Sequence, residues 1–177
     1  MEKSLSPDEY PSFYEQYIER VQENYVVDAL QRGKSEMMDF LQNIPNDKLN
    51  YRYAEGKWTP KQVLLHVSDT ERIFSFRALF FGRAHEETEL KGFDETIFAE
   101  NSNADERSWE ELVEDYISVR NATINLFKGF RESDLMKYGS VNHQKISVRA
   151  AGFIICGHEI HHREIIRERY LNESFKG

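Results

Sequence analysis

Apolar residues recur at helical spacing in four long stretches of the chain. These stretches cover roughly residues 14–43, 60–83, 109–130 and 148–171, and within each the apolar side chains fall three or four positions apart, on one face of a helix. No stretch shows a strong alternation of apolar and polar residues, which is the pattern typical of strands. Four amphipathic helices without a sheet predict an all-α four-helix bundle.

Capping residues mark several ends of these stretches. Thr59, Pro60 and Gln62 form a capping box with proline at the first helical position, and Ser108 begins a second capping box. Pro45 ends the first stretch, because the residue before a proline is disfavoured in a helix. We therefore expect helices to begin at about 60 and 109.

The connecting segments leave some local structure open. Segment 84–107 is long for a connection in a compact bundle, so we expect it to carry a short extra helix or a lid. A short strand pair near 138–146 is compatible with the sequence, and so is a break in the first stretch near Asn24 or Gly33. None of these features changes the predicted four-helix architecture.

Composition limits the class of protein and its partners. Hydrophobic residues make up 40% of the 177-residue chain and aromatics 13%, which predicts a single globular domain over 1–177. The net charge of −8 disfavours nucleic acid as a partner. There is no apolar signal region and no apolar run of membrane-spanning length. Cys156 is the only cysteine, which excludes an intrachain disulfide and favours the cytoplasm.

Histidines are concentrated near the end of the last stretch. His158 and His162 are four residues apart, so on a helix both imidazoles lie on one face and can share a metal ion. The same residues satisfy the His-Glu-x-x-His pattern of zinc proteases, with Glu159 in the place of the general base. The residues after His162 continue the helical pattern, and the downstream Gly and third His of the longer protease pattern are absent. We therefore reject a protease and regard Glu159 as a helix-face charge or an acceptor for a ligand.

A third histidine completes a possible metal site. His66 lies on the inner face of stretch 60–83, and it can meet His158 and His162 if the two helices are neighbours. Three neutral imidazoles leave an open position for water or substrate, which is the layout of a catalytic site. His161 is an alternative ligand to His162, or it packs at the helix interface, or it orients a ligand through a hydrogen bond.

Two arginines and a tyrosine on inner faces are candidates for binding substrate. Arg77 follows His66 by eleven residues, and Arg120 and Tyr116 lie on the core face of stretch 109–130. A buried guanidinium needs a partner, which is either an acidic side chain of the protein or the carboxylate of a cofactor or substrate. Tyr116 either packs with one hydrogen bond or reaches the site as a proton donor.

The ordered combination of these motifs resembles the DinB / YfiT-like superfamily of metal-dependent enzymes. The resemblance covers about residues 15–171 and rests on segments 51–60 (YRYAEGKWTP), 62–72 (QVLLHVSDTER), 77–79 (RAL), 119–123 (VRNAT), 157–162 (GHEIHH) and 167–171 (RERYL). It implies a four-helix bundle with a three-histidine site for a divalent metal, commonly Zn²⁺ or Ni²⁺. By position the ligands are His66, His158 and His162.

The resemblance also implies a class of reaction. Characterised relatives include transferases and isomerases that use a low-molecular-weight thiol, and dimers are frequent among them. A metal-dependent S-transferase with a small-molecule substrate, acting as a homodimer, is therefore the first hypothesis. The alternatives are a metal-dependent hydrolase and a non-catalytic metal-binding stress-response protein.

Overall fold

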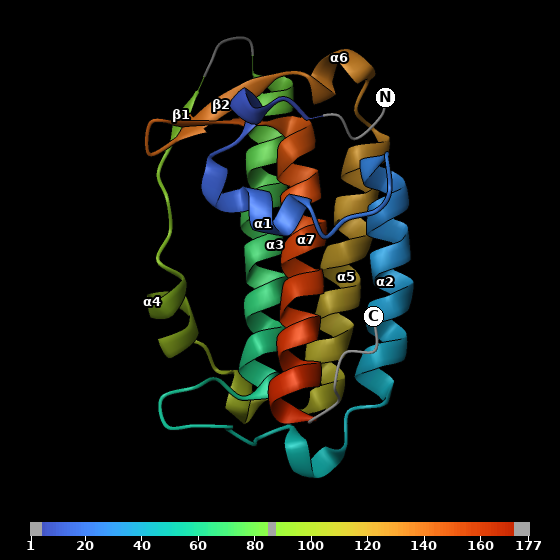
Figure 1. Ribbon diagram of the computed structural model, residues 1–177, viewed down its shortest axis with the longest axis vertical. Coiled ribbons are helices and arrows are strands. Elements are labelled where there is room, and N and C mark those ends of the chain that lie inside the picture. The colour runs from blue at the N-terminus through green and yellow to red at the C-terminus, as the bar shows by residue number, and fades with distance from the viewer. Residues whose placement is uncertain (1–4, 85–87, 172–177) are drawn as a thin grey trace.

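Four long helices packed side by side form the body of the computed structural model, which describes residues 5–84 and 88–171 (Figure 1). They are α2 (Val26–Gln42), α3 (Pro60–Arg83), α5 (Trp109–Lys128) and α7 (Val148–Ile165). α7 continues as a π-helical segment, Ile166–Tyr170. The predicted four-helix bundle is confirmed.

The long helices do not follow one another around the bundle. α3 packs against α5 and α7, and α2 packs against the same two helices, so α2 and α3 lie diagonally across the bundle. α2 and α7 run in one direction and α3 and α5 in the other (Figure 1). This arrangement makes α3 and α7 neighbours, as a site shared by their histidines requires.

Hydrogen-bonded caps fix the starts of three of these helices. The Thr59 side chain accepts a hydrogen bond from the Gln62 amide, and Ser108 accepts one from the Glu111 amide. Ser147 accepts a hydrogen bond from the backbone amide of residue 150 and caps α7. The predicted starts at 60 and 109 are confirmed.

The first predicted stretch, 14–43, is broken near Asn24 and not near Gly33. A short helix, α1 (Glu15–Ile18), follows 3₁₀ turns at Pro7–Glu9 and Ser12–Tyr14, and α2 begins only at Val26. α1 crosses the face of α7 (Figure 1). The two backbones approach closely at Gly157, where a Cβ atom would lie 1.9 Å from the Tyr17 carbonyl oxygen. Only glycine permits this approach.

The segments between the helices contain a small sheet, which corrects the expectation of no sheet. β2 (Tyr138–Val141) and β3 (Gln144–Ser147) pair antiparallel, in the segment near 138–146 where the sequence is compatible with a strand pair, and β1 (Glu89–Leu90) adds a parallel edge. Two-residue strands such as β1 are too short to leave a pattern in the sequence. The sheet covers one end of the bundle (Figure 1).

Shorter helices complete the connections. The expected extra helix in segment 84–107 is α4 (Glu95–Glu100), followed by a 3₁₀ turn at Ala104–Glu106. Another 3₁₀ turn, Asn46–Lys48, joins α2 to α3, and α6 (Glu132–Leu135) precedes the β2–β3 hairpin. No helix within residues 5–84 and 88–171 is both long and apolar enough to cross a bilayer.

The core is divided into two apolar clusters with a polar layer between them. One cluster includes Leu30, Phe74, Ile124 and Ile154, and the other includes Met37, Leu64, Leu112 and Ile166. Between the two clusters, each of the four long helices contributes one residue to the polar layer, which is either charged or a glycine. These residues are Gly33 on α2, Glu71 on α3, Arg120 on α5 and Glu159 on α7.

Candidate metal centre

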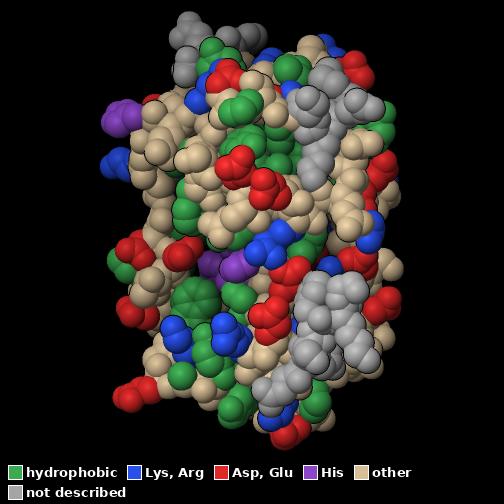
Figure 2. Space-filling model, viewed as in Figure 1, with side chains coloured by type: hydrophobic (Ala, Val, Ile, Leu, Met, Phe, Trp, Pro, Cys, Tyr) green, Lys and Arg blue, Asp and Glu red, His purple; other side chains and the backbone are tan. Residues whose placement is uncertain are grey.

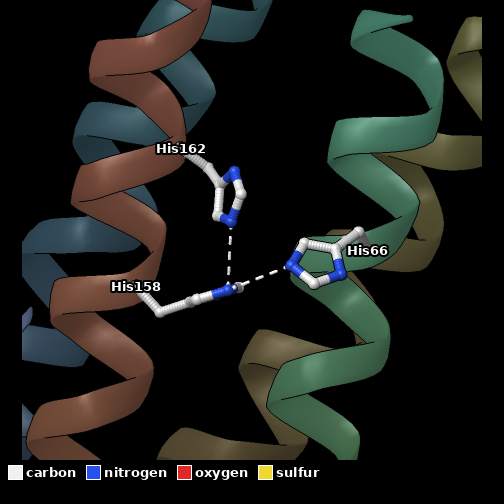
Figure 3. A group of neighbouring side chains, drawn as sticks. All are labelled: His66, His158 and His162. Atoms are coloured by element: carbon white, nitrogen blue, oxygen red, sulfur yellow. Dashed lines mark hydrogen bonds between the residues drawn. The ribbon is translucent and has the colours of Figure 1, made fainter. Parts of the chain in front are cut away.

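Three histidines from two neighbouring helices point their Nε2 atoms toward one another (Figure 3). His66 comes from α3, and His158 and His162 come from successive turns of α7. The Nε2 atom of His158 lies 3.0 Å from that of His66 and 3.1 Å from that of His162. One possible ligand atom from each of the three residues lies within 4.8 Å of the other two.

Hydrogen bonding alone does not satisfy this arrangement. An imidazole nitrogen carries either a proton or a lone pair, so the Nε2 atom of His158 cannot both donate to one neighbour and accept from the other. A metal ion bound at 2.0–2.1 Å by tetrahedral nitrogen ligands holds those nitrogens about 3.3 Å apart. The observed distances therefore fit three lone pairs directed at one shared ion.

Burial keeps the three imidazoles uncharged. It lowers the pKa of His66 to about 4. It also lowers the pKa values of His158 and His162 well below the ordinary value, and in both residues repulsion between the neighbouring histidines adds to this effect. Neutral imidazole is the form that binds metal, so the site needs no deprotonation at neutral pH.

Aromatic side chains enclose the histidines. The Tyr17 ring on α1 lies edge-on to His158, with centroids 5.5 Å apart, and to His161, at 5.3 Å. The Trp58 ring lies 4.8 Å from the His66 ring. Tyr17 was not predicted at the site. The sequence does contain a signal for Tyr17, because aromatic residues recur at helical spacing in segment 10–17. This segment is too short for the spacing to predict a separate helix.

His161 lies beside this group without joining it. It is half-buried, its ring centroid is 5.2 Å from that of His162, and it is not one of the three histidines that converge. Histidine side chains are visible near the middle of the face shown in Figure 2, and of the three converging histidines only His162 is not fully buried. His143 is exposed on the β2–β3 turn, and His85 lies outside the described residues.

Glu159 points away from the histidines into the polar layer of the core. Its side chain is fully buried, accepts a hydrogen bond of 2.5 Å from the Tyr116 hydroxyl, and lies 2.6 Å from Nη2 of Arg120. Arg120 also donates to both carboxylate oxygens of Glu71 and to the Leu30 carbonyl. The interpretation of Glu159 as a helix-face charge is wrong, because Glu159 lies on the side of α7 that faces the centre of the bundle, where Tyr116 and Arg120 of α5 contact it.

Two of the three substrate-binding candidates, Arg120 and Tyr116, belong to this polar layer. The polar ends of Arg120 and Tyr116 are both bonded to protein groups, and both residues have an exposed fraction of 0%. A substrate-binding role does not fit these placements. Of the two kinds of partner expected for a buried guanidinium, Arg120 has an acidic side chain of the protein, Glu71.

Arg77 is placed differently. Its side chain is buried, yet its Nη1 atom has no hydrogen-bond partner among the described residues. It lines a cavity of about 170 Å³ that His158 also lines. Of the three substrate-binding candidates, Arg77 is therefore the one that the structure brings to a space beside the histidines.

Comparison with known proteins agrees with this architecture. A family model described as the DinB superfamily matches residues 29–166. No curated protein matches the sequence at a significant level.

Two solved structures are similar in fold. YfiT from Bacillus subtilis, titled a probable metal-dependent hydrolase with an unusual four-helix bundle topology, is 18% identical, with 96% of this chain and 95% of that chain covered at a TM-score of 0.73. The DinB-like protein YjoA from Bacillus subtilis is 14% identical, with 84% and 92% covered at a TM-score of 0.58.

Proposed function

The chain belongs to the DinB superfamily, and we propose on this basis that it is a divalent-metal-dependent enzyme with His66, His158 and His162 as ligands. The observation that carries the proposal is the convergence on one point of three uncharged imidazoles, of which those of His66 and His158 are buried and that of His162 is half-buried. Imidazole ligands suit Zn²⁺ and Ni²⁺. When bound, such an ion would act as a Lewis acid and lower the pKa of a thiol or water beside it.

A small thiol is the nucleophile that we propose first. Among the described residues no carboxylate oxygen joins the three histidines, and Glu159 is held in the core by Arg120 and Tyr116. Activation of water commonly uses such a base, whereas a free thiol has a pKa near 8.5 and needs little help to ionise. In the reaction the S–H proton passes to solvent and a sulfur–carbon bond forms. The leaving group then departs from that carbon with its electron pair.

Hydrolysis is the second candidate. The structural neighbour YfiT, which shares the fold, carries the description of a probable metal-dependent hydrolase. In this case the nucleophile would be hydroxide, generated without a protein carboxylate. A non-catalytic metal-binding protein is the third outcome to be tested.

Metal content tests the ligands. We expect purified protein to contain about one divalent ion per chain, and His66→Ala and His158→Ala to lose it. His143→Asn is the control, because His143 is exposed at a turn with φ 64°, which asparagine tolerates. Unchanged metal content in both alanine variants would refute the site.

Activity assays then separate the three functions. We expect consumption of 1-chloro-2,4-dinitrobenzene that requires an added thiol and is abolished by a chelator. Chelator-sensitive hydrolysis of an ester such as p-nitrophenyl acetate without thiol would identify a hydrolase instead. Absence of both activities from fully loaded protein would favour the metal-binding protein.

A further inference from the structure

One nitrogen of the Arg77 guanidinium lacks a partner beside the cavity that Arg77 and His158 line. Arg77 is 3% exposed, its guanidinium lies over the Phe74 ring at 4.6 Å, and its Nη1 atom is buried without a hydrogen-bond partner among the described residues. The Tyr14 hydroxyl lies near enough to favour the charged guanidinium, but burial still lowers the pKa of Arg77. A buried guanidinium without an acidic partner is costly, so this placement calls for a ligand.

The Thr70 hydroxyl is a second buried polar group that lacks a hydrogen-bond partner among the described residues. The Thr70 side chain is buried and lines the same cavity. Thr70 lies between His66 and Arg77 along α3, and the cavity that it lines is also lined by Ile154 and His158 of α7. Hydroxyl and guanidinium are both donors suited to an anionic oxygen.

We propose that Arg77 and Thr70 form a subsite for the carboxylate of a small organic acid, whose reacting end extends toward His66 and His158. The proposal rests on the proposed function, because it names the class of substrate that the metal centre would act on. Phe74, over which the Arg77 guanidinium lies, is three residues nearer to His66 than Arg77 is. The remaining separation along the α3 axis is about 12 Å at 1.5 Å per residue. The acid therefore carries its reacting atom several bonds away from the carboxylate.

Charge favours a carboxylate over a phosphate. Arg77 is the only Lys or Arg that lines the cavity among the described residues, and Glu95 is the only acidic residue there. One guanidinium neutralises a monoanion, whereas a phosphate dianion would keep an unpaired charge in a partly enclosed space. The cavity volume of about 170 Å³ also limits the ligand to a small molecule.

Glu95 is the one side chain of the cavity wall that could neutralise Arg77 instead. It is exposed at the start of α4, and no ion pair joins it to Arg77 in the part of the chain that the structure describes. If Glu95 were the partner of Arg77, its removal would strengthen the binding of an external anion substantially. Glu95→Gln therefore belongs in the test.

The test is titration calorimetry of metal-free protein with hexanoate, with neutral hexanamide and inorganic phosphate as comparison probes. We expect hexanoate to bind and hexanamide to bind at least tenfold more weakly. Arg77→Gln should weaken hexanoate binding about tenfold or more, as loss of a hydrogen bond to a charged group does, and Thr70→Val by a few-fold. Arg77→Lys should keep part of the affinity. Arg83→Gln removes an exposed charge from the same helix and is the matched control.

The outcomes separate this subsite from the metal centre. His66→Ala should lose metal and keep hexanoate binding, so failure of the proposed function leaves this result intact. The subsite is refuted if hexanoate binds only to metal-loaded protein and Arg77→Gln leaves its affinity unchanged. It is equally refuted if hexanamide binds as well as hexanoate, if phosphate binds more tightly than hexanoate, or if Glu95→Gln raises hexanoate affinity tenfold. Circular dichroism melting confirms that each variant is folded.

Discussion

His158 and Glu159 are adjacent in the sequence and lie in different environments. Successive residues of an α-helix differ in direction by about 100°, so the imidazole reaches the cluster of three histidines while the carboxylate reaches the polar layer of the core. The protease-like pattern therefore divides into two functions. His158 serves the site, and Glu159 joins helices through Arg120 and Tyr116.

This division predicts how Glu159→Gln will behave. Gln removes the negative charge from a buried network but leaves Arg120 paired with Glu71. We expect the free energy of unfolding to fall by about 1–3 kcal/mol in urea titrations, with metal content unchanged. Loss of metal without loss of stability would contradict the placement of Glu159 in the core.

The lowered pKa of His66 predicts how the stability of metal-free protein depends on pH. The unfolded chain takes up the proton near pH 6.5 and the folded chain only near pH 4, so a fall in pH through this window favours unfolding. His66 alone should cost about 3 kcal/mol by pH 4, and His158 and His162 should act in the same direction.

Urea unfolding at a series of pH values measures this effect. We expect His66→Gln to flatten the loss of stability between pH 6.5 and 4, and His143→Asn to leave it unchanged. An equally steep loss in His66→Gln would show that other groups control acid unfolding.

Among the elements, the contact of α1 with α7 decides how the metal centre is enclosed. The helix α1 has four residues and would not be stable alone. It is held because Gly157 lets the Tyr17 backbone lie directly on α7, and this places the Tyr17 ring against His158. One glycine in the histidine motif thus positions an element that lies far away in the sequence.

Gly157→Ala should displace α1. The added Cβ would lie 1.9 Å from the Tyr17 carbonyl oxygen, a backbone atom that cannot rotate away. We expect a loss of about 1–3 kcal/mol in unfolding free energy and faster hydrogen exchange in segment 15–18. Gly129→Ala is the control, since its Cβ would lie no closer than 3.3 Å to its neighbours. Unchanged exchange in α1 would contradict this packing.

At the scale of the whole molecule, the proposed metal centre would join α3 to α7, because His66 lies on α3 and His158 and His162 lie on α7. A ligand that binds only the folded state adds about 2.7 kcal/mol when its concentration is a hundred times its Kd. For a chain of this size such a gain raises Tm by about 5–10 °C. We expect chelation to lower Tm by this amount in wild-type protein and not in His66→Ala, as measured by calorimetry. Equal effects on both proteins would place the stabilising ion elsewhere.

The sequence predicted the long helices well because each helix buries one face, and the apolar residues of that face recur at helical spacing within the segment itself. The predicted boundaries 60–83 are those of α3, since Thr59, Pro60 and Gln62 act locally. The strand β1 was missed, because its two residues are held by pairing with β2 and by no pattern of their own. Pairing of two copies of the chain stays a prediction.

By itself the sequence determined the four helical stretches and the three histidines, because helical periodicity fixes which residues share a face. The tertiary structure alone decided that α3 and α7 are neighbours, that Arg120 pairs inside the core, and that Arg77 lines a cavity with no acidic partner in the described part of the chain. These outcomes depend on which helix lies opposite each inward residue. That choice is made by packing between segments distant in the chain, and periodicity within one segment carries no information about it.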